Sequence, residues 1–155
     1  MRAVRERGSV SIEVAVLAPA FIGLMVLAGV AGRTAVAAEA VESAAHDAAR
    51  AASIARDART GRTAATDAAR RQLDWSGLHC TASPALTFGG SVRGTTTSFA
   101  AAYRSAPGVP ATVTVTVTCT VSFADLRAPG LPGVPGNKTV SASFTSPLDT
   151  YRSRR

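Results

Sequence analysis

The sequence predicts an α+β fold in which a long N-terminal helix precedes a small antiparallel sheet. A run without charged residues, Val14 to Gly32, leads into an alanine-rich segment that reaches Trp75 without a proline, and this composition favours helix. From Ala111 onward, apolar and polar residues alternate as in a half-buried strand. These changes predict four segments: a basic leader (1–8), a transmembrane helix (9–32), an alanine-rich extracytoplasmic helix (33–75) and a small β-rich extracytoplasmic region (76–155).

The charge-free run is long enough to cross a bilayer. Val14 to Gly32 spans about 28 Å as a helix, close to the ~30 Å hydrocarbon core of a membrane. Pro19 lies inside this run and is expected to kink the helix. Arginines are more frequent before the run than directly after it. Because positive residues favour the cytoplasmic side, we expect a cytoplasmic N-terminus and an extracytoplasmic C-terminal part.

The alanine-rich segment carries a narrow stripe of small residues at helical spacing. The stripe consists of Val36, Ala40, Ala44, Ala48, Ala52 and Ala55. It suits close helix packing, either in the core of a filament or against the protein's own sheet. Gly61 interrupts the alanine-rich pattern and is expected to end or bend the helix.

The alternation of apolar and polar residues predicts the strands. The clearest is Ala111 to Phe123, with valines, Cys119 and Phe123 on one face and threonines on the other. A second is predicted at Thr139 to Thr145, after a proline- and glycine-rich loop, and a third around Ala85 to Phe88. Gly89 to Arg93 resembles part of a nucleophile elbow but lacks its closing glycine, so we predict a turn there. The rest of the segment up to Ala106 carries no clear pattern.

Cys80 and Cys119 are the two cysteines of the chain. In an exported domain such a pair favours a disulfide, which would stabilise the fold by roughly 4 kcal/mol in the chain-entropy model. The alternative is a metal site formed by His79, Cys80 and Cys119. These three residues lack the paired spacing of common zinc sites, so the disulfide is the preferred prediction.

No catalytic motif, metal site or cofactor site is predicted, and we do not expect an enzyme. The net charge of +7 comes from arginines that are scattered and, along the helix, interleaved with acids, and the aromatic content is 5%. This pattern indicates a solvated surface and no base-stacking platform, so no nucleic-acid partner is expected.

The beginning of the chain carries one further pattern, Arg7-Gly8-Ser9-Val10-Ser11-Ile12-Glu13. It places a lone carboxylate five residues after a glycine, at the mouth of an apolar helix, where an unpaired charge is costly. The first 30 residues or so resemble the N-termini of type IV pilin-like proteins, and in particular the TadE-like minor pilins or pseudopilins of tight-adherence (Flp) pilus systems. The size of the extracytoplasmic region favours the minor class over the very short major pilins.

The resemblance implies a specific pathway. A prepilin peptidase would cut between Gly8 and Ser9, and the new amine of Ser9 would neutralise Glu13 of a neighbouring subunit, which sets the register of assembly. The implied partners are the membrane, the prepilin peptidase, other pilin or pseudopilin subunits and the pilus assembly machinery. The implied location is the cytoplasmic membrane, with incorporation into a surface pilus.

Two alternatives stay open from the sequence. Ala35-Val36-Ala37 has the form of a signal-peptidase site, and cleavage after it would release a soluble secreted domain. In the second alternative, the chain is a static single-pass envelope protein that keeps its N-terminus. The position at which the mature chain starts separates these alternatives from the pilin-like interpretation.

Overall fold

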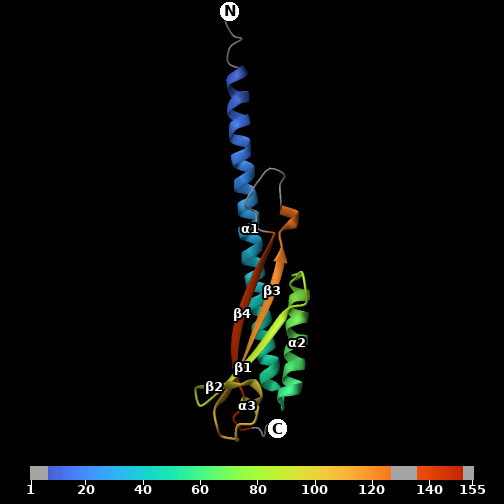
Figure 1. The fold of residues 1–155 in the computed structure, drawn as a ribbon, viewed down its shortest axis with the longest axis vertical. Helices are drawn as coiled ribbons and strands as arrows, with labels where there is room; N and C mark the ends of the chain where they lie inside the picture. Colours follow the sequence, from blue (N-terminus) through green and yellow to red (C-terminus); the bar gives the residue numbers. More distant parts are fainter. Residues whose placement is uncertain (1–6, 127–135, 152–155) are drawn as a thin grey trace, which may run out of the picture.

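A computed structural model describes residues 7–126 and 136–151 and has the predicted α+β architecture (Figure 1). A long helix projects from a domain made of a second helix, a short third helix and one four-stranded antiparallel sheet. The elements in chain order are α1 (Arg7–Ile54), α2 (Ala58–Trp75), β1 (Ala85–Val92), β2 (Thr95–Ser98), α3 (Phe99–Tyr103), β3 (Ala111–Ser122), the 3₁₀ turn η1 (Ala124–Leu126) and β4 (Asn137–Pro147).

The alanine-rich segment 33–75, predicted as one helix that ends or bends at Gly61, forms two helices that are separated by residues 55–57. α1 ends at Ile54, and α2 turns back to lie beside the lower half of α1 (Figure 1). Asp57 is the N-cap of α2: its carboxylate accepts hydrogen bonds from the Thr60 backbone N–H at 2.9 Å and from the Thr60 hydroxyl at 2.8 Å. This cap satisfies donors that a helix start leaves unpaired, and it fixes the reversal at 55–57.

The sequence suggested that Gly61 ends or bends a helix. In the structure Gly61 lies inside α2. Its role is steric. A Cβ atom at this position would collide with the hydroxyl of Tyr103. That hydroxyl donates a hydrogen bond to the carbonyl of Ala52 in the last turn of α1, where carbonyls have no partner within the helix. Gly61 therefore makes room for a side chain from α3 that caps α1.

The sheet has the order β2-β1-β3-β4, with every neighbouring pair antiparallel. β3 is the central strand, and its buried row of Ala111, Val113, Val115, Val117, Cys119 and Val121 follows the predicted alternation. β4 extends the predicted strand at 139–145 by two residues at each end. β1 continues through Gly89–Val92, so the turn that we predicted over Gly89–Arg93 is confined to Arg93 and Gly94, which have φ of 51° and 80°.

The segment for which we predicted no element forms β2 and α3. α3 lies against the inner face of the sheet, where Gly90 permits close approach: a Cβ atom there would sit 2.8 Å from that of Ala102. Phe99 and Tyr103 of α3 are buried, and their rings pack against each other at a tilt, with centroids 5.1 Å apart. These aromatic side chains fill the end of the domain at which α1 ends.

The alanine stripe packs inside the domain. Ala40, Ala44, Ala48 and Ala52 are buried, and α1 contacts α2, β3 and β4. Small side chains let the elements approach closely on both sides of α1. The stripe is therefore buried inside the protein's own domain, whose α2 and sheet both contact α1. Val36 is exposed and Ala55 lies after the end of α1, so the stripe is shorter than predicted.

The outer face of the sheet is covered by hydroxyl groups. Hydroxyls on β3 and β4 form cross-strand hydrogen bonds of 2.8–3.0 Å in the pairs Thr114–Thr145, Thr116–Ser143, Thr118–Ser141 and Thr120–Thr139. These bonds fix the register between the two strands from the solvent side, and the valine row fixes it from the core side. Most of the basic leader and the predicted proline- and glycine-rich loop fall in 1–6 and 127–135, which lie outside the described residues.

Candidate membrane and assembly segment

The N-terminal half of α1 is apolar and exposed. Between Glu13 and Gly29 it extends beyond the sheet and α2 (Figure 1). Eight large apolar side chains in this part are each more than half exposed: Val14, Val16, Leu17, Phe21, Ile22, Leu24, Met25 and Leu27. Such a continuous apolar surface far exceeds what a soluble monomer leaves in contact with water. This half of the helix requires an apolar environment.

By length and composition, this helix can cross a membrane. The stretch Glu13–Ile54 contains an 18-residue window with a mean hydropathy of 2.4, and none of that window is buried inside the domain. α1 continues through Pro19 as one helix. A signal sequence near an N-terminus meets the same criterion.

The predicted processing and register residues lie at the start of α1. Gly8 and Ser9 belong to its first turn, and Glu13 follows as an exposed residue at the beginning of the apolar half. At about 1.5 Å per residue, Glu13 lies roughly 7 Å along the helix axis from Gly8. A carboxylate in this position marks the boundary between the helix start and the apolar surface.

The junction between the exposed and the packed halves of α1 is fixed by side-chain contacts. Val30 packs against the core, and its carbonyl accepts a hydrogen bond from the Thr34 hydroxyl at 2.7 Å. Arg33 binds both carboxylate oxygens of Asp125 in η1, at 2.6 and 2.7 Å. The Arg33 hydrogen bond holds the pKa of the Asp125 carboxyl below its ordinary value. The sequence carries no signal for this pair, because the partners are 92 residues apart.

Cys80 and Cys119 form a disulfide, with Cα atoms 5.4 Å apart. Cys119 is buried in the inner row of β3, and Cys80 lies in the segment between α2 and β1. Next to the bond, the Thr81 N–H donates to the Thr120 carbonyl at 2.8 Å. The bond thus ties the segment that follows α2 to the centre of the sheet. With both sulfur atoms in a disulfide, the alternative metal site with His79 is wrong.

Other clusters capable of chemistry are sparse in the described part of the chain. Within 7–126 and 136–151, no three His, Cys, Asp or Glu side chains gather closely enough to hold a metal ion. His46 is half-exposed, lies 3.3 Å from the Asp47 carboxylate and stacks edge-on against Phe144. Comparisons of this chain with protein-family models, curated proteins and solved structures find no match.

Proposed function

We propose that this protein is a TadE-like minor pilin or pseudopilin of a tight-adherence (Flp-type) pilus or secretion system. In this proposal the chain enters the cytoplasmic membrane through the apolar half of α1, with its domain outside. A prepilin peptidase cuts after Gly8, and the mature subunit assembles with other pilin or pseudopilin subunits through the same helix.

The exposed apolar half of α1 carries the proposal. It is joined without a break to the packed half, so one continuous helix connects the apolar surface to the domain. Exposed apolar side chains follow directly after Glu13, beginning with Val14. Lipid covers such a surface before assembly, and neighbouring helices cover it afterwards. A single helix therefore serves as membrane anchor and as assembly element.

Glu13 supplies the register in this proposal. Its carboxylate stands at the mouth of an apolar segment, where a charge without a partner is unfavourable. Cleavage after Gly8 creates an amine at Ser9 of an incoming subunit. That amine neutralises Glu13 of its neighbour when the two helices are correctly aligned. A wrong alignment leaves both charges unpaired in apolar surroundings.

The contacts of Ala37 and of residues before it weigh against release by signal peptidase. Ala37 is fully buried in the core. A chain that starts at Ala38 would lose Ala37, the packing of Val30 and the Arg33–Asp125 ion pair. The folded domain uses these residues, so the segment before Ala38 belongs to it as well as to the apolar helix.

A Glu13→Ala variant tests the proposed role of this carboxylate. We expect normal expression and normal cleavage after Gly8, because the peptidase acts before assembly. We expect incorporation into filaments to fall about tenfold or more, because the register charge is missing. The measurement is the amount of the protein in sheared surface filaments relative to the amount in membranes.

Glu13→Asp is the matched control for this experiment. It retains the negative charge at the same helix position and should restore most of the incorporation. Incorporation of Glu13→Ala at the wild-type level would contradict the proposed role of Glu13.

A further inference from the structure

The end of the domain that faces the apolar half of α1 consists of the end of β3, the turn η1 and the start of β4 (Figure 1). Arg33 of α1 contacts this end of the domain. Its Nη1 atom donates hydrogen bonds to both carboxylate oxygens of Asp125 and lies 3.5 Å from the Ser122 carbonyl oxygen. We call residues 122–125 and 137–138 the β3–β4 end.

The apolar half of α1 and the domain meet without a linker. The charge-free run of α1 ends at Gly32, and Val30 already packs against the core of the domain. As a helix the run is about 28 Å long, so in a bilayer it fills the ~30 Å hydrocarbon core and leaves Arg33 at its boundary. The headgroup layer beyond that boundary is roughly 5–8 Å thick. The β3–β4 end, which Arg33 contacts directly, therefore falls within this layer.

The cations at this end suit lipid phosphate groups. Lys138 is exposed and is paired in the sheet with Val121, next to Ser122. The side chain of Arg33 is 44% exposed, and its bonds to Asp125 use Nη1 alone. Its Nε and Nη2 atoms take no part in these bonds, and together they form a fork that matches two phosphate oxygens. Against these two cations the β3–β4 end has one carboxylate, that of Asp125, so the net charge here is positive.

We propose that the β3–β4 end lies in the phospholipid headgroup layer and that Arg33 and Lys138 bind lipid phosphate there. This inference rests on the proposed function, in which the apolar half of α1 crosses the membrane. It adds that the domain lies directly against the bilayer. Arg33 holds Asp125 with one part of its guanidinium and a lipid phosphate with the other, so one side chain connects α1, η1 and the membrane surface.

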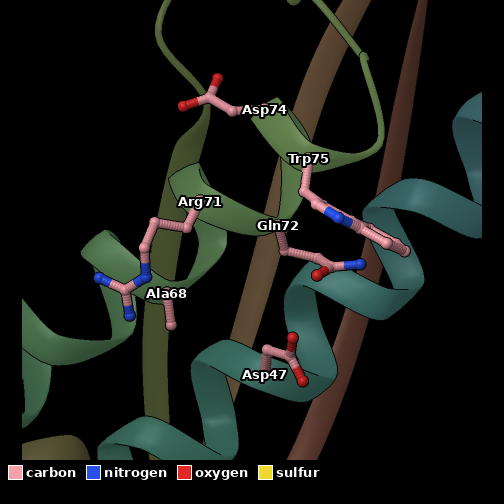
Figure 2. A pocket seen from close by; sticks show the side chains of 6 residues that line it. All are labelled: Asp47, Ala68, Arg71, Gln72, Asp74 and Trp75. Atoms are coloured by element: carbon pink, nitrogen blue, oxygen red, sulfur yellow. The ribbon is translucent and has the colours of Figure 1, made fainter.

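Tryptophan quenching by labelled lipids tests this placement with the full chain in phospholipid vesicles. Trp75 is the chain's one tryptophan. It is 85% exposed and lines an open hollow between α1 and α2 (Figure 2), so phenylalanine can replace it without disturbing the core. In the Trp75→Phe background, Ala124→Trp reports on the β3–β4 end and Phe21→Trp on the middle of the apolar half. Tyr151→Trp reports on the opposite end of the domain, where Tyr151 lies beside the end of α1.

The three variants should differ in the lipid label that quenches them. A spin label on the headgroup should quench the Ala124→Trp variant about twofold or more strongly than a label at the end of the acyl chain, because the residue lies at headgroup depth. The Phe21→Trp variant should show the reverse order. The Tyr151→Trp variant should be quenched by neither label, because it lies at the end of the domain farthest from the membrane.

Lipid selectivity tests the role of the two cations separately from depth. In mixed vesicles, brominated phosphatidylglycerol should quench the Ala124→Trp variant about twofold or more strongly than brominated phosphatidylcholine at the same mole fraction. Adding Arg33→Gln/Lys138→Gln should abolish this preference. Lys138→Gln alone leaves the Arg33–Asp125 pair in place and should reduce the preference in part.

A matched control removes the same charge from the opposite end of the domain. Arg56 and Arg104 are exposed there, after the ends of α1 and α3. Arg56→Gln/Arg104→Gln should leave the preference for phosphatidylglycerol unchanged. Circular dichroism and the melting temperature establish that each variant is folded.

Two results would overturn the inference while membrane insertion of α1 stands. One is quenching of Phe21→Trp with as little quenching of Ala124→Trp as of Tyr151→Trp. The other is a preference for phosphatidylglycerol that survives the loss of both cations. Absence of quenching of Phe21→Trp would instead contradict insertion itself, and with it both the proposed function and this placement.

Discussion

Replacing both cysteines by alanine is expected to lower the free energy of unfolding by roughly 2–5 kcal/mol. The Cys80–Cys119 bond closes a loop of 39 residues, and such a bond removes conformations from the unfolded chain. It also holds the segment after α2 against β3, where Cys119 is buried among the valines. We expect the double variant to fold at low temperature and to unfold at a clearly lower temperature than the wild type.

Thermal unfolding of the detergent-solubilised full chain, with and without a reductant, measures this effect. A reductant should lower the wild-type melting temperature toward that of the Cys80→Ala/Cys119→Ala variant and leave the variant unchanged. The double replacement is preferable to a single one, because a single one leaves a free thiol. Equal melting temperatures for all samples, or two reactive thiols in the non-reduced wild-type protein, would contradict the assigned bond.

The second large effect is a loss of stability at high pH that depends on Tyr103. Burial, together with the nearby Asp57 carboxylate, raises the pKa of the Tyr103 phenol to about 12. The unfolded chain ionises the same group near pH 10. Because the folded-state pKa is the higher one, this contribution to stability is complete below pH 10 and is lost as the pH rises to 12. The expected loss is about 2–3 kcal/mol.

Tyr103→Phe separates this contribution from other alkaline effects. The variant lacks the hydroxyl that caps the Ala52 carbonyl, so at neutral pH it should be less stable by about 1 kcal/mol. Between pH 10 and 12, however, its stability should decrease less than that of the wild type. Tyr151→Phe is the control, because Tyr151 is 94% exposed. Parallel stability curves for the wild type and Tyr103→Phe over this pH range would contradict the assignment.

The strands with strict alternation could be predicted from the sequence, and the end of the alanine-rich helix could not. Ala111 to Phe123 can bury one face in a single way, so its pattern fixes both the strand and its inner row. Around Ala55 the composition still favours helix. The reversal of the chain depends on the Asp57 cap and on the packing of α2 against α1. Asp57 and Thr60 do carry a local capping signal, whereas Gly61 misleads because its role is to accommodate Tyr103.

Contacts between residues far apart in the chain could not be predicted from the sequence either. The Arg33–Asp125 pair arises from packing between α1 and η1, and its two residues are 92 positions apart in the chain. The pattern at Gly8, Ser9 and Glu13 is different in kind. It is local and can be read directly from the residues, but the processing and assembly that we propose for it lie outside a single folded chain.

The intact mass and N-terminal sequence of the protein purified from membranes of its native host test the central proposal most directly. Prepilin-type processing predicts a mature chain that starts at Ser9 and retains Glu13 as its fifth residue. A start near Ala38 in the culture fluid, or an intact terminus at Met1 or Arg2 in the membrane, would contradict it.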